Sequence, residues 1–225
     1  IVVTGLGMVT PIGLDVPTTW EALNRGTSGI NKIASFDTTG FETTFAAEAT
    51  GFDPELYMDK KQARRLDRFA QLANAATHQA LGQANLNLFD GSIDPKRVGV
   101  IIGSGVGGIL TLSEQWQVLA EKGPDRISPF LVPMMLADMA SGQISIMFGA
   151  KGPNYCIVTA CSSGADAIGL ASQMIKRDEV DIVIAGGAEA PICPITLSGF
   201  NACKALSTRN DDPAGASRPF DRDRD

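Results

Sequence analysis

The sequence predicts an α/β fold in which helices cover both faces of a mainly parallel sheet. Strand-like apolar runs recur at Ile1 to Thr4, Val98 to Gly103, Tyr155 to Ala160 and Val180 to Ala185, and helix-like segments lie between them. Strands joined by crossover helices form parallel sheets, and functional sites on such sheets lie at the carboxyl ends of the strands. We therefore expect the site where one of these runs ends.

Composition and charge narrow the class of protein. The chain has 225 residues, 24 of them glycine, and only 6% aromatic residues, which indicates close backbone packing and many turns. Its 19 Lys and Arg against 25 Asp and Glu give a net charge of −6, which disfavours nucleic acid and anionic membranes. No apolar run approaches the roughly 18 residues of a membrane span. We expect a soluble protein that binds neither nucleic acid nor membrane.

The four cysteines are Cys156, Cys161, Cys193 and Cys203. They form no C-x-x-C pair and stand beside a single histidine, so a zinc site is not expected. A secreted disulfide scaffold would be shorter and richer in cysteine, which favours reduced thiols in a cytoplasmic compartment. All except Cys161 are assigned to packing, and we predict no metal or other cofactor.

Three helices are predicted from spacing and capping signals. "WEALNRGTSG" is typical of a short helix that ends at Gly26, and Asp67 is a plausible N-cap for the amphipathic helix "RFAQLANAATHQALGQANL". His78 lies within that second helix, where a lone histidine is more often a surface or packing residue than a catalyst. "GADAIGLASQMIKRDE" is apolar around most of its circumference, which indicates a helix buried inside an assembly.

Cys161 is the first candidate for chemistry. It lies in "IVTACSSGADAIG", where a strand-like run meets the start of a helix. There its sulfur would lie near the positive end of the helix dipole, which favours a nucleophilic thiolate. The alternative is that Cys161 is a small buried hydrophobic residue. Position alone leaves both interpretations open.

The run "GSGVGG", from Gly103 to Gly108, satisfies the dinucleotide-binding pattern G-x-G-x-x-G after a strand and before a helix. The second strand that should end on an acidic residue about 20 positions later is missing, because that region reads "GPDRISPFLVPMM". This disfavours a dinucleotide-dependent oxidoreductase. "TGLG", from Thr4 to Gly7, is a weaker match, and we expect it to form a tight turn.

A basic cluster precedes and enters the second predicted helix. We use this name for five residues, Lys60, Lys61, Arg64, Arg65 and Arg68. Such a run is either a solvated helix face or a docking surface for an acidic partner.

Four motifs in order, "TACSSG", "VIAGGAEA", "ALSTRNDDP" and "SRPFDRDRD", resemble the β-ketoacyl-acyl-carrier-protein synthases, in particular the type II elongating condensing enzymes. The resemblance implies a thiolase-like αβαβα layered sandwich with a mainly parallel mixed sheet, built from two similar halves and working as a homodimer. Residues 1–207 would form the N-terminal half, and residues 208–225 would begin the linker into a C-terminal half.

The same resemblance assigns roles to residues of this chain. Cys161 would accept an acyl group from acyl carrier protein and then condense it with malonyl carrier protein, with loss of carbon dioxide. The acyl channel would be lined by Val106, Val132 and Phe200. The basic cluster, together with Arg126 and Lys204, would dock the acidic carrier protein, and no cofactor is implied.

The family's two catalytic histidines, its catalytic lysine and its gating phenylalanine loop would lie beyond Asp225, and His78 matches neither histidine. We therefore expect residues 1–225 alone to lack condensing activity. Two related functions remain as alternatives, a polyketide ketosynthase and a non-catalytic chain-length partner subunit. The partner subunit typically lacks the nucleophile, so Cys161 argues against it.

Overall fold

The computed structural model describes residues 1–225, which divide into two compact units. The first unit contains Ile1–Gly7 and Asp53–Pro191, and the second contains Met8–Phe52 and Ile192–Asp225. Cys161 and the basic cluster belong to the first unit, whereas Phe200 and Lys204 belong to the second.

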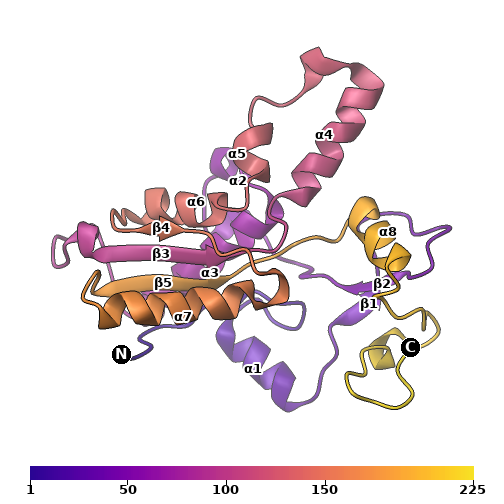
Figure 1. Ribbon diagram of the computed structural model, residues 1–225, viewed down its shortest axis with the longest axis horizontal. Helices are drawn as coiled ribbons and strands as arrows, with labels where there is room; N and C mark the ends of the chain where they lie inside the picture. Colours follow the sequence, from indigo (N-terminus) through magenta and orange to yellow (C-terminus); the bar gives the residue numbers. More distant parts are fainter. The chain divides into compact units, whose positions relative to one another are not determined.

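A parallel sheet of three strands organises the first unit (Figure 1). Its order is β4-β3-β5, with β3 at Val98–Gly103, β4 at Asn154–Tyr155 and β5 at Ile182–Gly187. β3 pairs with β5 along its whole length, from Val98 opposite Ile182 to Gly103 opposite Gly187. The carboxyl ends of β3 and β5 therefore meet at one edge, where the candidate site lies.

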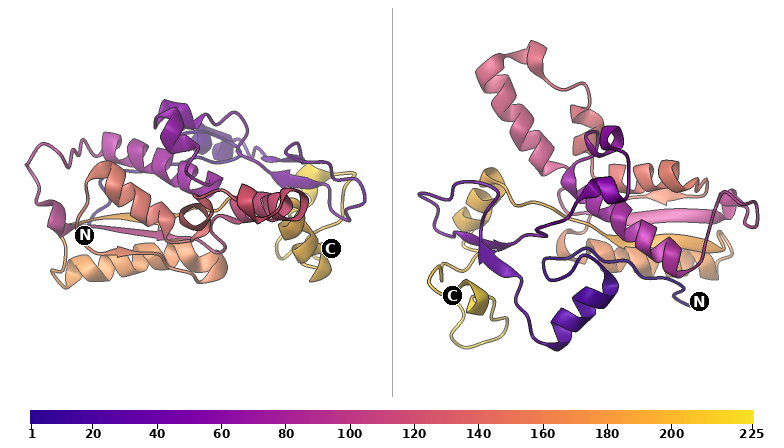
Figure 2. Two further views of the ribbon diagram at one scale, coloured as in Figure 1. Left: turned by 90° about the horizontal axis from the view of Figure 1, so that it is seen from above. Right: turned by 180° about the vertical axis from the view of Figure 1, so that it is seen from behind.

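Helices cover both faces of this sheet, as Figure 2 shows. All six residues of β3 are buried, and its four apolar side chains belong to two apolar clusters. Val98, Val100 and Ile102 pack with α3 (Arg68–Gln83) and α6 (Met139–Phe148), while Ile101 packs with α7 (Ser163–Lys176). An apolar strand buried on both faces is typical of parallel sheets.

Asp67 joins the starts of two helices. One carboxylate oxygen accepts a hydrogen bond from the Phe69 N–H and so caps α3, as predicted. The other accepts bonds from the N–H and the hydroxyl of Thr111, in the first turn of α4 (Ile109–Lys122). α4 projects away from the sheet, and the chain returns through η3 (Pro124–Arg126) to the short α5 (Leu131–Met135).

The second unit contains a short antiparallel pair and two helices. β1 (Ile30–Lys32) pairs with β2 (Phe45–Ala47), α1 spans Val16–Asn24 and α8 spans Pro194–Ala202. α1 ends as predicted, with Gly26 at a positive φ of 68°. The remaining elements of the chain are short: α2 (Lys60–Ala63) and the 3-10 turns η1 (Pro54–Leu56), η2 (Pro95–Arg97), η4 (Ala160–Ser162) and η5 (Pro213–Gly215).

Two strand predictions need correction. Val98 to Gly103 is confirmed, but residues 1–4 form no strand, and Val2 and Val3 are exposed. No strand of this chain pairs with them, so their apolar side chains gain no cover. Of the third run only Tyr155 lies in a strand, β4, and the residues after it lead into the turn that contains Cys161.

The "TGLG" segment is not a turn. A Cβ on Gly5 would lie 2.0 Å from the Ala80 carbonyl oxygen, and one on Gly7 would lie 1.7 Å from that of Ala76. Both glycines therefore let the N-terminal segment lie directly on α3.

α7 is covered on one face only in this chain. Ala167, Ala171 and Met174 are buried against the sheet, while Ile168 on the opposite face is 57% exposed. The sheet covers one face of α7 in this chain, and the prediction that the helix is buried inside an assembly stays a prediction. None of the helices is long and apolar enough to cross a membrane.

Candidate active site

Cys161 lies in the middle of a tight turn that leads into α7. The turn is η4, and it is followed directly by the first residue of the helix, Ser163. Ala160 has a φ of 51°, in the left-handed region that residues with a side chain rarely adopt. Cys161 is exposed, and no hydrogen bond within the chain uses its backbone N–H. The thiol and a free N–H donor therefore stand together at the positive end of a 14-residue helix.

A network of hydroxyl groups holds this turn. The Ser163 hydroxyl accepts a hydrogen bond from the Thr159 N–H at 3.0 Å and donates to the Ala160 carbonyl at 2.6 Å. The hydroxyls of Thr159 and Ser162 both donate to the Asp166 carboxylate, and these bonds hold the pKa of Asp166 below its usual value. The strained conformation at Ala160 is thus fixed from both sides.

Glycines at the ends of two strands allow the turn to lie on the sheet. A Cβ on Gly103, the last residue of β3, would lie 2.3 Å from the Ser163 carbonyl oxygen. A Cβ on Gly187, the last residue of β5, would lie 2.8 Å from the Gly164 Cα. Any side chain at either strand end would push α7 away, so these glycines set the position of Cys161.

Residues 104–108, which we call the glycine turn, lie next to the cysteine turn. A Cβ on Gly105 would be 3.8 Å from the Ala160 Cα. The Glu189 carboxylate, just after β5, accepts hydrogen bonds from the N–H groups of Gly105 (2.5 Å) and Val106 (2.9 Å). Glu189 lies in the quoted "VIAGGAEA" motif, but neither its residue type nor its position in the sequence predicts this role.

These contacts also argue against a dinucleotide-binding site in the glycine turn. A phosphate in the glycine turn would need the N–H groups that Glu189 already occupies, and the acidic side chain would repel it. Gly107 and Gly108 lie against the backbone of Ala137 and of Met134 and Met135. The glycines of "GSGVGG" therefore serve packing between protein segments.

Two of the three predicted acyl-pocket residues lie on these adjoining segments. Val106 is on the glycine turn, and Val132 is on α5, whose last residue accepts a hydrogen bond from the Gly108 N–H through its carbonyl. Both valines are exposed, at 48% and 58%, and their assignment to an acyl channel stays a prediction. The third, Phe200, lies on α8 of the second unit and is also exposed.

The other cysteines differ from Cys161 in their surroundings, and all four are free thiols. Burial, with a smaller contribution from the Asp138 and Glu189 charges, raises the pKa of the Cys156 thiol, so it is a poor nucleophile. Cys193 is buried, as predicted for a packing residue. The same prediction is wrong for Cys203, which is exposed because it lies at the end of α8 where the chain turns.

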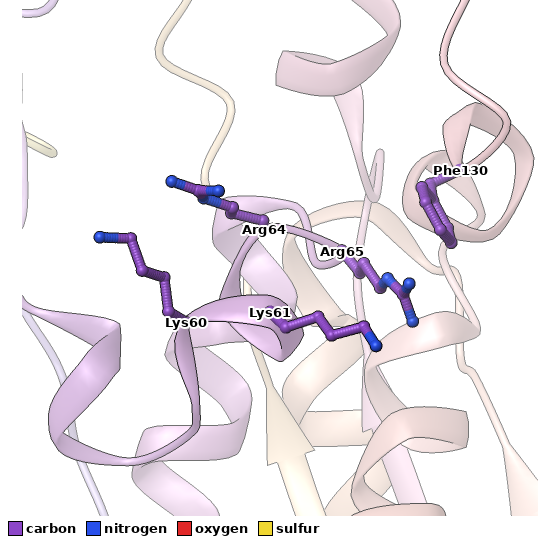
Figure 3. A pocket seen from close by; sticks show the side chains of 5 residues that line it. All are labelled: Lys60, Lys61, Arg64, Arg65 and Phe130. Atoms are coloured by element: carbon purple, nitrogen blue, oxygen red, sulfur yellow. The ribbon is translucent and has the colours of Figure 1, made fainter.

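The basic cluster forms part of a hollow. Lys60, Lys61, Arg64 and Arg65 line it together with Phe130, and its volume is about 500 Å³ (Figure 3). The Arg65 guanidinium lies over the Phe130 ring, with 4.5 Å between Cζ and the ring centroid. The lining does not include Arg68, the first residue of α3, where burial lowers the pKa of the guanidinium.

The two outlying basic residues are placed differently. Arg126 is exposed in η3 of the first unit and does not line the hollow. Lys204 belongs to the second unit, where its ammonium lies 3.0 Å from a carboxylate oxygen of Glu42. Its charge is thus already paired within the chain.

His78 is an exposed residue of α3 that contacts neighbouring rings, which agrees with the prediction of a surface or packing residue. Its ring makes edge contacts with the rings of Tyr57 and Phe148, at centroid distances of 5.8 and 6.4 Å. These contacts place it among aromatic side chains of the first unit and give it no role beside Cys161.

Comparisons with known proteins agree with this geometry. Two relatives are described as 3-oxoacyl-[acyl-carrier-protein] synthase 2, from Vibrio cholerae (49% identical) and from Synechocystis (46% identical). Each aligns with all 225 residues of this chain and with 54% of its own length. The chain therefore spans about half the length of the curated relatives it matches.

Solved structures match the fold. The ishigamide ketosynthase/chain length factor superposes on 99% of this chain with a TM-score of 0.88 and 28% identity, covering 53% of that structure. A β-ketoacyl synthase from Burkholderia phymatum superposes on all of it, with a TM-score of 0.86 and 29% identity, covering 55%. A type II PKS acyl-carrier protein in complex with its ketosynthase, 21% identical, matches in fold over 90% of this chain and 54% of its own, with a TM-score of 0.74.

The profile of one protein family spans the whole sequence. It is described as "Beta-ketoacyl synthase, N-terminal domain", and it matches residues 1–225. Together with a cysteine turn held at the carboxyl ends of a parallel sheet, this match shows that the chain belongs to the β-ketoacyl synthase family, as its N-terminal domain.

Proposed function

We propose that the full-length protein is a 3-oxoacyl-[acyl-carrier-protein] synthase of fatty-acid elongation and that Cys161 is its nucleophile. The observation that carries the proposal is the exposed Cys161 thiol in a locked turn at the start of α7. The synthase relatives, at 46% and 49% identity over the whole chain, support this class of reaction.

The reaction would proceed in two covalent stages. First, the Cys161 thiolate attacks the carbonyl carbon of an acyl thioester, and the carrier's thiolate leaves, so that the acyl group becomes a Cys161 thioester. Next, a malonyl thioester loses carbon dioxide, and its enolate carbon attacks the acyl carbonyl. Expulsion of the Cys161 thiolate releases a 3-oxoacyl thioester and regenerates the nucleophile.

The residues of this chain would serve the first stage. The free N–H of Cys161 is a donor suited to the oxyanion that forms when the carbonyl is attacked. Val106, on the glycine turn, and Val132, on α5 packed against that turn, present exposed apolar surface. Each methylene buried against such surface stabilises the bound acyl chain by about 0.8 kcal/mol. Phe200, on the second unit, is proposed to complete this channel.

The basic cluster, with Arg126 and Lys204, is proposed to dock the acyl- or malonyl-loaded carrier protein. Four of these residues share one hollow, which would offer a positive surface on a chain of net charge −6. The carrier named in the relatives' descriptions and in one ketosynthase complex supports this choice of partner. Opposite charges would mainly accelerate the encounter.

A homodimer is proposed on the basis of an exposed apolar stripe. Leu112, Trp116 and Leu119 lie on one face of α4 and are 40%, 68% and 40% exposed. Contiguous exposed apolar patches mark interaction surfaces. A second copy of the full-length protein would cover them, and light scattering would give the mass of a dimer.

Mass spectrometry tests the nucleophile directly. The full-length protein is incubated with acyl carrier protein thioesters, and the modified peptide is located. The acyl mass is expected on the Cys161 peptide and absent from the peptide that carries Cys203, the other exposed thiol. Cys161→Ala should abolish acylation and condensation, whereas Cys203→Ser should retain both.

The result that would overturn the proposal is equally specific. Acylation at Cys203, or undiminished condensation by Cys161→Ala, would remove Cys161 from the reaction. Acylation of Cys161 without condensation of malonyl carrier protein would leave an acyltransferase and exclude the synthase.

A further inference from the structure

Arg65 makes a contact that sets it apart from the other basic residues of the hollow. Its guanidinium lies over the Phe130 ring at 4.5 Å, a distance at which a cation and an aromatic face attract each other. In Figure 3, Lys60 and Arg64 extend away from Phe130, while Arg65 extends toward its side of the hollow. Arg65, which follows the C-cap of α2, therefore connects the end of that helix to the segment of Phe130.

Phe130 links the Arg65 contact to the proposed acyl pocket through α5. It is the residue that immediately precedes α5, and the helix carries Val132 in its first turn. The Phe130 carbonyl accepts a hydrogen bond from the Met134 N–H, which ties the two ends of the helix together. A shift of Phe130 would therefore move Val132.

α5 in turn rests on the glycine turn. A Cβ on Gly108 would lie 2.0 Å from the Met134 carbonyl oxygen, so the two backbones touch. The Gly108 N–H donates to the Met135 carbonyl at 3.1 Å. Contacts thus run without a gap from Arg65 through α5 to the turn that carries Val106.

We propose that Arg65 is a positioning residue for the acyl pocket: its contact with Phe130 holds α5, and with it Val132, in place beside the acyl chain. The inference rests on the proposed function and deepens it. Arg65 would act in two ways, as one of several charges that attract the carrier and as the only one that also supports the pocket wall.

The two roles make different demands on the side chain. Attraction of the carrier requires a positive charge, which Arg64 supplies equally well. Support of Phe130 requires a planar cation over an aromatic ring, which Arg64 does not provide because it extends away from Phe130. Acyl donors without a carrier protein distinguish the two roles, because they enter the acyl pocket but do not bind the docking surface.

The experiment compares short and long acyl donors, both as carrier thioesters and as N-acetylcysteamine thioesters. The full-length protein and its variants Arg65→Gln, Phe130→Leu and Arg64→Gln are assayed for kcat/KM of Cys161 acylation. With the carrier-free donors, Arg65→Gln and Phe130→Leu should each lower the ratio of long-chain to short-chain kcat/KM by about threefold. Long chains lose more because they contact more of the wall.

Two further variants identify the cause. Phe130→Tyr keeps the ring and should restore the ratio of the unsubstituted protein. The double variant Arg65→Gln with Phe130→Leu should lower the ratio no further than either single change, because both remove one contact. Arg64→Gln should slow transfer from carrier thioesters without changing this ratio.

The inference and the proposed function fail in different ways. If the unsubstituted protein does not acylate Cys161 with any donor, the proposed function is wrong. If Cys161 is acylated but Arg65→Gln behaves as Arg64→Gln does, with an unchanged carrier-free ratio, then Arg65 has no positioning role.

Discussion

At the scale of single residues, the candidate site depends on two glycines that have no side chain. Gly103 and Gly187 leave room at the carboxyl ends of β3 and β5, and the backbone of the α7 N-terminus fills that room. Cys161 can be presented by a strained turn because Ala160, the residue before it, is held by the Ser163 hydroxyl. The proposed nucleophile, Cys161, is thus positioned by two glycines and one hydroxyl group.

Replacing Gly103 by Ala tests this placement. The new Cβ would lie 2.3 Å from the Ser163 carbonyl oxygen, so α7 must move. We expect a loss of about 1–3 kcal/mol in the free energy of unfolding and slower acylation of Cys161. Gly186→Ala is the control, since nothing lies within 4 Å of its added methyl group. Equal effects in the two variants, measured by denaturant unfolding of the full-length protein, would contradict this explanation.

Glu189 fixes the glycine turn through two backbone N–H groups. Glu189→Ala removes both charge-assisted hydrogen bonds and should slow acylation of Cys161 about tenfold, because the turn beside Ala160 loosens. Glu189→Gln retains an acceptor oxygen and should lose less. Kinetics with a carrier-free thioester measure the effect, and an unchanged rate in Glu189→Ala would show that the turn holds its shape without the carboxylate.

At the scale of elements, one buried carboxylate joins α3 to α4. Asp67 is 2% exposed and accepts hydrogen bonds from the N-terminal turns of both helices. A negative charge at two helix N-termini is stabilised by both dipoles. This single residue therefore sets where α4 leaves the sheet.

Asp67→Ala should lower the free energy of unfolding by about 2–4 kcal/mol, because it strands the buried N–H and hydroxyl of Thr111. Asp53→Ala removes an exposed cap from η1 and should cost at most about 1 kcal/mol. Urea unfolding of the full-length protein gives both values. A loss in Asp67→Ala no greater than in Asp53→Ala would refute the double-cap role.

A second clamp joins the starts of β3 and β5. The Arg97 guanidinium donates two hydrogen bonds to the Asp181 carboxylate, and these bonds hold the pKa of Asp181 below its usual value. The same guanidinium also bonds the side chain and the carbonyl of Asp178. Because these groups are at the surface, their contribution to stability is modest and sensitive to salt.

The lowered pKa of Asp181 determines how the stability of the protein changes with pH. Asp181 stabilises the fold fully above its unfolded-state pKa of about 3.9, and this stabilisation is lost as the pH falls through the lower folded-state value. Arg97→Gln should therefore destabilise the protein at neutral pH, and the difference should shrink below about pH 4. The free energy of unfolding, measured from neutral pH to below pH 4, tests this prediction, and Arg177→Gln is a neighbouring control. A difference that stays constant with pH would exclude the clamp as its source.

At the scale of the whole molecule, charge is distributed unevenly. The net charge is −6, yet four basic residues line one hollow of the first unit. Lys204, in the second unit, is held by Glu42 instead. Removing one charge from the hollow and removing the charge of Lys204 are therefore different perturbations.

Substitutions that remove these charges should change the affinity for the carrier protein and the dependence of that affinity on salt concentration. Lys61→Gln should weaken binding of the carrier several-fold and flatten its dependence on ionic strength, because long-range attraction is screened by salt. Lys204→Gln should have a smaller effect, and Glu42→Gln should strengthen binding by releasing the Lys204 charge. Calorimetry at several salt concentrations measures this. Affinities that do not vary with salt would contradict the docking proposal.

The sequence by itself determined the features that depend on near neighbours along the chain. Strand β3, the Asp67 cap and the helix that begins just after Cys161 follow from periodicity and from residue types a few positions apart. The family resemblance came from motifs of the same local kind. These features are predictable because backbone hydrogen bonding and helix capping act over a few residues.

Only the tertiary structure decided how distant segments meet. Glu189 and the Gly105 N–H lie 84 residues apart, and Lys204 and Glu42 lie 162 apart. Spacing also failed at residues 1–4, where an apolar run has no strand beside it in this chain. Such contacts depend on which surfaces the folded chain brings together, and a linear pattern does not encode the distance between two surfaces.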